Sequence, residues 1–318
     1  MKRNTPTNPI VSVRFLRRGE DVLWRRCAFS SKAEEESNKP PFTDKPSFRA
    51  DRAEAHLVAE QDGRIVGKME SILHEPHEAI LIDPVVVPEA SVEQVAGELL
   101  AKALEVAKSL KVRRIMVILQ DRLPYIRELI PRMGDWGFRA LWEKNLYRLN
   151  PLDLPPYLDS PLWADLNFAS FGGLDDRVFR ATLDLVLQSA TNPEEKGETA
   201  IGMLEYFVDG CNRDGNYFPE DWELALINDE PVGVVIPAYY DEQRQEAGDL
   251  FVGVVPTRRG QGLGKLLYYR GLRTIGKRGV TTYIDSTDRM NRPMIRVFES
   301  LNFRQIMTQY YFEPADET

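Results

Sequence analysis

Apolar and polar residues follow two different periods along the first half of the chain. Residues 55–59 and 65–72 alternate with period two around the turn Gln61-Asp62-Gly63, a pattern that predicts a β-hairpin. The apolar run 80–87 predicts a strand that is buried on both faces. Residues 92–110 then carry apolar side chains at helical spacing, so we expect a helix that packs on a sheet.

The remaining elements of this half complete the sheet. Residues 115–119 form a second buried apolar strand, and a helix is expected at residues 124–133. Two further strands are expected at residues 138–142 and 144–149. A strand, a helix and another apolar strand imply a right-handed crossover within one sheet. The predicted fold class is therefore α/β (α+β), with a mixed central sheet that is flanked by helices.

The second half of the chain repeats the first at an offset of about 167 residues. The matching landmarks are residues 62–67 with 228–233, 85–88 with 253–256, 99–100 with 266–267, 112 with 280, and 136–139 with 301–304. This period is far longer than that of a solenoid repeat, so it indicates a duplicated domain. We expect one domain at residues 1–150 and another at 151–318, joined by the proline-rich stretch 151–161.

The second copy carries additional helical material before its hairpin. Residues 175–188 and 198–211 have helical patterns, and the hairpin begins with the strand 222–227. A near-continuous apolar strand follows at residues 250–255, and another is expected at 281–285.

Composition and charge exclude several classes of protein. The net charge of −8 argues against a nucleic-acid scaffold, whose binding face is basic. No apolar run could span a bilayer, and residues 1–9 lack the apolar core of a signal peptide. Cys27 and Cys211 have no metal-ligand spacing and suit a reducing compartment, so we expect a cytoplasmic protein. Pro76 separates His74 from His77, and no metal site is expected. The oligomeric state is not predicted.

A glycine-rich turn stands between the strand 250–255 and a helical run. Gly260, Gly262 and Gly264 alternate with other residues, and Arg258, Arg259 and Lys265 add positive charge. Glycines let successive backbone N–H groups converge on an anion at the start of a helix, where the helix dipole is positive. The spacing is neither that of a dinucleotide fold nor that of a Walker loop. This turn predicts a phosphate site of another kind.

Two motifs together resemble the GNAT superfamily of N-acetyltransferases. Residues 254–264 are similar to its motif A, which follows a Val-x-Pro turn. Asn291 then begins a helix that leads to Phe303, as in the family's second motif. Asn302 replaces a common glycine and tolerates the same left-handed turn. Phe298 replaces a common tyrosine, so the family's usual general acid is absent at that position. The paired layout is similar to that of mycothiol synthase and of aminoacyl-transferring relatives.

The resemblance implies that acetyl-coenzyme A binds to the second copy as a co-substrate. Its pantetheine arm would pair with the backbone of the strand 250–255, and its pyrophosphate would lie on the glycine turn. Asn291 would cap its helix and also contact the cofactor. The implied cofactor-binding residues are Val252, Gly253, Val254, Arg259, Gly260, Gln261, Gly262, Leu263, Gly264, Lys265 and Asn291.

The first copy lacks these glycines. Val92, Glu93 and Val95 align with Arg259, Gly260 and Gly262. A branched side chain would crowd a phosphate there and a carboxylate would repel it. We therefore expect a degenerate first domain without a cofactor loop.

Acetyl transfer to a protonated amine needs a carboxylate that removes a proton. Asp249 is the first candidate, because it precedes the strand that would bind the cofactor. Glu223 is the second, on a hairpin strand that we expect beside that one. Asp285 and Asp288 flank Ser286, the alternative base position in the family. The tyrosines that could serve as the general acid are Tyr268, Tyr283, Tyr310 and Tyr311.

The resulting hypothesis is an acetyl-coenzyme A dependent N-acetyltransferase, active in its second domain. The family resemblance implies direct attack by the amine of a small molecule or peptide, with no nucleic-acid or membrane partner. The alternatives are a non-catalytic acyl-coenzyme A sensor and a transferase of another acyl group. In the second copy, residues 175–211 would shape the acceptor pocket, by the same resemblance. Nothing in the sequence identifies the acceptor.

Overall fold

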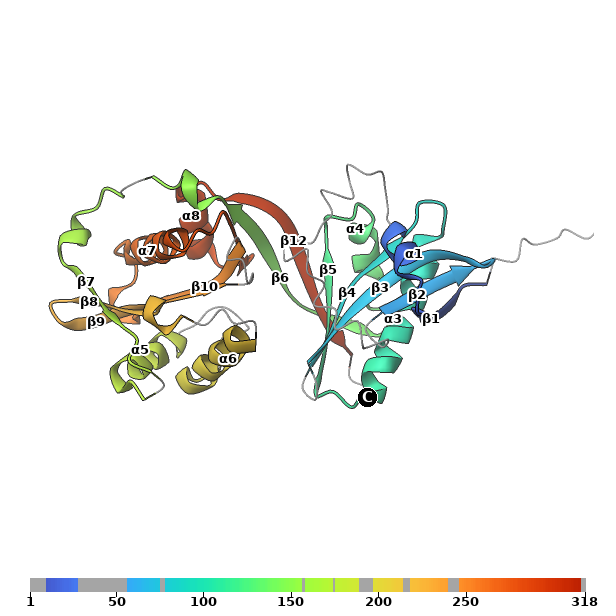
Figure 1. Cartoon of the computed structure of the whole chain (residues 1–318), viewed down its shortest axis with the longest axis horizontal. Coiled ribbons are helices and arrows are strands. Elements are labelled where there is room, and N and C mark those ends of the chain that lie inside the picture. The colour runs from blue at the N-terminus through green and yellow to red at the C-terminus, as the bar shows by residue number, and fades with distance from the viewer. Residues whose placement is uncertain are drawn as a thin grey trace, which may run out of the picture. The chain divides into compact units, whose positions relative to one another are not determined.

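The computed structural model describes residues 10–27, 56–74, 78–155, 158–173, 175–188, 197–213, 218–239 and 246–315. The polar stretch 1–9, His77 and part of the expected linker lie outside these ranges. The chain forms two compact units (Figure 1). Among the described residues, unit 2 is Lys144–Ile306, and unit 1 is everything up to Glu143 together with the chain from Met307 onward.

Unit 1 is a mixed sheet in the order β1-β2-β3-β4-β5-β12, in which only β4 and β5 are parallel. The long helix α3 packs against β2, β3 and β4. Its core joins α3, the α4 region and the inner strands around Leu99, Leu119 and Ile126. The elements of unit 1 are β1 (Ser12–Phe15), α1 (Asp21–Arg26), β2 (His56–Gln61), β3 (Arg64–His74), β4 (Glu78–Val86), α3 (Val92–Ser109), β5 (Arg114–Gln120), α4 (Ile126–Leu129), the 3-10 turn η2 (Ile130–Arg132), the start of β6 (Phe138–Leu149) and most of β12 (Arg304–Pro314).

Unit 2 is a second mixed sheet in the order β6-β11-β10-β9-β8-β7, in which only β10 and β11 are parallel. Helices α7 and α8 lie on one face of this sheet, and α5 and α6 lie on the other (Figure 1). Its elements are η3 (Pro151–Asp153), η4 (Pro161–Ala164), β7 (Leu166–Ser170), α5 (Arg177–Leu187), α6 (Ala200–Arg213), η5 (Pro219–Asp221), β8 (Glu223–Ile227), β9 (Glu230–Tyr239), β10 (Glu246–Val254), η6 (Pro256–Arg258), α7 (Leu263–Lys277), β11 (Thr282–Asp288) and α8 (Arg292–Ser300).

The sequence predictions for α3, α5, α6, α7 and α8 are confirmed within a few residues, and each unit has the expected α/β fold. The expected helix at 124–133 is shorter, because the 3-10 turn η2 with Pro131 ends α4 at Leu129.

The expectation of two strands at 138–142 and 144–149 is wrong. Residues 138–149 form the single strand β6, because Trp142-Glu143-Lys144 contains no residue that favours a turn. The second part of β6 pairs with β11 in unit 2, from Asp288↔Lys144 to Tyr283↔Leu149. The C-terminal strand β12 pairs with β5 in unit 1. Each unit therefore receives its last strand from the other copy of the sequence. The division of the sequence at residue 150 concerns those two copies, and it stays a prediction.

Candidate functional site

Strand β10 of unit 2 separates from β11 soon after it begins. The two strands pair only at Glu246↔Thr282 and Ala247↔Tyr283 among the described residues. Beyond this point β10 continues to pair with β9 alone, up to Val254↔Gly233. The backbone N–H and C=O groups of β10 that face β11 therefore have no strand partner over several residues. An open edge of this kind can accept an extended ligand as an added strand. Val252, Gly253 and Val254 belong to this stretch of β10, and their role in binding a cofactor stays a prediction.

The β9–β10 register shifts between Gly248 and Phe251, so Asp249 lies at a β-bulge where the two parallel strands separate. Bulges occur next to active sites because they redirect side chains out of the regular alternation. The backbone of Asp249, the first-choice base, therefore lies at the point where β10 leaves β11.

The glycine turn after β10 contains two residues with left-handed backbone conformation. Gly260 and Gly262 have φ angles of +76° and +87°, which only glycine adopts easily. A Cβ atom added at either position would meet no atom within 4 Å outside the two neighbouring residues. Gly262 is the N-cap of α7 and has no side chain to bond the first-turn N–H groups. These donors and the helix dipole point to an anion.

Arg259 lies between this turn and α5. Its Nε atom donates to the Val254 carbonyl at 3.0 Å, and its Nη2 atom donates to the Val186 carbonyl at 3.3 Å. The arginine therefore ties the end of α5 to the end of the open strand.

Helix α5 approaches the open strand most closely at Gly253. A Cβ atom at Gly253 would lie 2.2 Å from the Cγ1 atom of Val186. The sequence showed the glycine but not this neighbour, which comes from a helix far away in the chain.

We expect Gly253→Ala to lower the free energy of unfolding by about 1–3 kcal/mol, the usual cost of overpacking a core. Because the clash is with Val186, the added substitution Val186→Ala should recover part of this loss. Urea denaturation of the wild type, both single variants and the double variant measures the coupling. Simple additivity of the two effects would contradict this account of the contact.

Asn291 is the N-cap of α8, and its Oδ1 atom accepts from the N–H of Met294 at 3.2 Å. The capping role is therefore confirmed. Phe298 on the same helix is fully buried, with its ring 4.5 Å from that of Tyr147. It is a core residue and offers no proton to the cleft.

Glu223, the second candidate base, forms an ion pair on the α7 side of the sheet. Its two oxygens accept from Arg270 at 2.6 and 2.8 Å, and this interaction raises the pKa of Arg270. The expectation that its strand lies beside β10 is wrong. Strand β9 returns from the β8–β9 hairpin and separates β8 from β10.

Tyr268 and Tyr283 surround the buried carboxylate of Asp285. Their hydroxyl groups donate to its Oδ2 atom at 2.5 and 2.6 Å, and the N–H of Ser286 donates to its Oδ1 atom at 2.7 Å. Burial, followed by the charge of Asp285, raises the pKa of Tyr283 well above its usual value. Tyr310 and Tyr311 belong to unit 1.

The corresponding place in unit 1 is closed by the protein itself. Strands β4 and β5 stay paired up to Ile82↔Ile118. Beyond that pair, the hydroxyl of Tyr125 accepts from the N–H of Val86 at 2.8 Å and donates to the carbonyl of Pro84 at 3.0 Å. By the repeat, Pro84 and Val86 correspond to Val252 and Val254.

A carboxylate joins the same two strands of unit 1. Asp83 accepts from the N–H of Gln120 at 2.7 Å and pairs with Arg122 at 3.1 Å. Of these contacts, those of Tyr125 use the β4 backbone groups that correspond to Val252 and Val254 on the open edge of unit 2.

Unit 1 also has no glycine turn. Helix α3 begins at Val92, so Val92, Glu93 and Val95 are helical residues, and Ser91 caps the helix through Gln94. Glu93 adds a negative charge to its first turn. In contrast, the first turn of α7 carries no acidic residue.

Within the described part of the chain, no three His, Cys, Asp or Glu side chains lie close enough together to hold a metal ion. None of the helices in the same ranges has both the length and the apolar character that a membrane crossing requires.

Relatives with curated functions match the chain over part of its length. A mycothiol acetyltransferase from Acidothermus cellulolyticus is 26% identical over 216 residues, which are 63% of this chain and 62% of that protein. A mycothiol acetyltransferase from Kytococcus sedentarius is 25% identical over 61% of each chain. The chain thus spans less than two thirds of the length of these relatives.

Solved structures match over nearly the whole length. A GCN5-related N-acetyltransferase from Sphaerobacter thermophilus has a TM-score of 0.66 at 16% identity and covers 96% of both chains. A tandem GNAT protein of the clavulanic acid biosynthesis pathway has a TM-score of 0.57 at 15% identity and covers 97% of this chain and all of that one. At these identities the likeness concerns the fold. The sequence model of the acetyltransferase (GNAT) family matches residues 22–134 and again 183–303, so the chain belongs to this family in a tandem form.

Proposed function

We propose that this protein transfers an acetyl group from acetyl-coenzyme A to the amine of a small molecule, with the active site in unit 2. The observation that carries the proposal is the open edge of β10, which leads into the uncapped glycine turn of α7. The corresponding edge in unit 1 is occupied by Tyr125. The membership in the GNAT family and the mycothiol acetyltransferase relatives support acetyl as the transferred group.

The residues of unit 2 fit a coenzyme A molecule. The N–H groups from Gly260 to Lys265 would hold the pyrophosphate, with open space in front of Gly260 and Gly262. The open edge of β10 along Val252, Gly253 and Val254 would pair with the amides of the pantetheine arm, apart from the Val254 carbonyl, which already accepts from Arg259. Gln261 and Arg259 are exposed beside the turn, whereas Leu263 is buried and anchors the start of α7. When bound, the cofactor supplies the activated acetyl group.

The acceptor amine must lose a proton before it can attack. We assign this role to Asp249, at the bulge where β10 leaves β11. Glu223 stays the second candidate, although its carboxylate is held by Arg270. Tyr268 and Tyr283 are already engaged with Asp285, so we propose that the thiolate leaves without a dedicated tyrosine acid. The modest pKa of a thiol makes this feasible.

We expect the chain to bind one molecule of acetyl-coenzyme A. Titration calorimetry on the full chain should give a stoichiometry near one, because Tyr125 and the capped start of α3 leave no site in unit 1. Tyr125→Phe removes the buried hydroxyl and should cost about 1–3 kcal/mol of unfolding free energy without changing the stoichiometry. A stoichiometry of two would contradict the assignment of a single site.

The experiment that tests the proposed function is an acceptor screen. Release of free coenzyme A thiol would be followed with a thiol reagent across a panel of small-molecule and peptide amines. Turnover with any amine supports the proposal, provided that a variant of the glycine turn loses both turnover and cofactor binding. Tight cofactor binding without turnover would instead favour an acyl-coenzyme A sensor. The buried Phe298, which cannot donate a proton, is the observation that favours this alternative. Turnover with other acyl donors would reassign the group transferred.

A further inference from the structure

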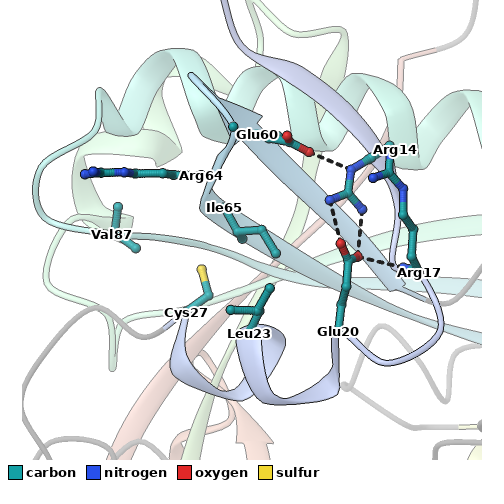
Figure 2. A pocket seen from close by; sticks show the side chains of 10 residues that line it. Arg14, Arg17, Glu20, Leu23, Cys27, Glu60, Arg64, Ile65 and Val87 are labelled. Carbon is teal, nitrogen blue, oxygen red and sulfur yellow. Dashed lines mark hydrogen bonds and ion pairs between the residues drawn. The ribbon is translucent and has the colours of Figure 1, made fainter.

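Unit 1 has a cavity of its own. The cavity has a volume of about 460 Å³. It lies between α1, the β2–β3 turn and the residue that follows β4 (Figure 2). Its walls include Arg14, Arg17, Glu20, Glu60 and Arg64, and its floor is formed by Leu23, Cys27, Ile65 and Val87.

One wall of the cavity is a hydrogen-bonded group of three charged side chains. Arg14 donates to Glu20 at 2.8 and 2.9 Å and to Glu60 at 2.7 Å (Figure 2). The pairing with Arg14 lowers the pKa of Glu20, and the backbone N–H of Arg17 also donates to this carboxylate. Arg14 is therefore shared between both carboxylates that line the cavity.

The arginines outnumber the carboxylates in this lining. Arg17 and Arg64 are exposed; the charge of Arg17 acts on Glu20 and helps to lower its pKa, whereas the ion pairs within the described part of the chain do not include Arg64. Arg64 stands at the end of the cavity near Val87, away from the Arg14 group (Figure 2). A guanidinium has a planar set of donors that matches a phosphate or a carboxylate.

The floor between the charged ends is apolar. Leu23 is 50% exposed although it is aliphatic, and Ile65 and Val87 are half-buried beside it. Burial raises the pKa of the Cys27 thiol to about 11, so this group is uncharged at neutral pH. An apolar floor with a few placed charges is typical of small-molecule sites.

We infer that unit 1 binds an amphiphilic anion in this cavity, with its anionic head at Arg64 and its apolar body over Leu23 and Ile65. Such a molecule covers the exposed apolar floor and supplies the missing negative charge. The site does not depend on the acetyl transfer proposed for unit 2.

The probe for this site is octyl phosphate, used with the full chain below the concentration at which it forms micelles. Titration calorimetry should show binding to the wild type. Octanol has the same chain without charge, and inorganic phosphate has the charge without the chain. Both should bind at least about tenfold more weakly than octyl phosphate, since each lacks one of the two recognised parts.

Two variants and their matched controls locate the binding site. Arg64→Ala and Leu23→Glu should each weaken binding about tenfold or more. Arg113→Ala alters another exposed arginine of unit 1, and Val22→Glu alters the neighbouring exposed position of α1 outside the cavity. These controls should bind within about twofold of the wild type. All four positions are exposed, so the variants should fold, which circular dichroism verifies.

Three results would overturn the inference. The first is no binding of octyl phosphate to the wild type. The second is equal binding of octanol or of inorganic phosphate. The third is a loss in the Val22→Glu control as large as that in Leu23→Glu, which would indicate a diffuse surface effect.

Discussion

Replacing Gly262 with valine is expected to weaken acetyl-coenzyme A binding by about 100-fold. Gly262 has a φ of +87°, a region that a β-branched residue does not tolerate, so the turn must change shape. The change would withdraw at least two N–H groups from the pyrophosphate. Hydrogen bonds to charged groups contribute about 1.5–3 kcal/mol each, and every 1.4 kcal/mol is tenfold in affinity. Titration calorimetry with acetyl-coenzyme A measures this loss.

Gly279 offers a matched control for this experiment. It has a φ of +83° and open space around it, and it follows the C-terminal end of α7 instead of preceding its start. Gly279→Val imposes a similar backbone strain, so both variants should lose comparable unfolding free energy. Only Gly262→Val should lose cofactor affinity. Unchanged binding by Gly262→Val would remove the phosphate role of the turn, and equal loss in both variants would assign the effect to stability.

Local patterns were sufficient to predict most elements of the fold. The hairpin around Asp62-Gly63, the apolar strands and the helices each have a signal within a short window of sequence. The exchange of β6 and β12 has no such signal, because it depends on which distant strand completes each sheet. The missing turn between Trp142 and Lys144 was the available indication that residues 138–149 form one strand.

In the candidate site, too, the features with a local sequence signal were predictable, and those that depend on distant residues were not. The glycine turn was predictable because positive φ angles demand glycine at Gly260 and Gly262. The loss of these glycines in the first copy was also visible. The plug that closes that copy was not, since Tyr125 reaches the backbone of β4 from 39 residues away. The sequence indicated this plug only through Tyr125 itself, an aromatic residue near the place where the second copy has Asn291.

For Glu223, the sequence pattern could not distinguish between two roles. In the sequence it is a carboxylate in an apolar strand, a pattern that suits either a base or an ion pair. The structure brings it to Arg270, which is 47 residues away. Both side chains of this pair are partly shielded from water, so we expect Glu223→Gln and Arg270→Gln to lower the unfolding free energy by similar amounts. If Glu223 were also the base, only Glu223→Gln would slow the transfer beyond its effect on stability.

Asp249→Asn is therefore the variant with the largest expected effect on the rate. General-base help contributes about 10²–10⁴-fold, so kcat should fall by that factor once an acceptor is known. The affinity for acetyl-coenzyme A should stay within about twofold, because the bulge at Asp249 adjoins the open edge without forming the phosphate turn. Glu246→Gln, earlier on the same strand where β10 still pairs with β11, is the matched control and should keep the wild-type rate. A near-wild-type kcat in Asp249→Asn would exclude this residue as the base, and the same measurement on Asp285→Asn would then decide whether the buried carboxylate between Tyr268 and Tyr283 relays the proton instead.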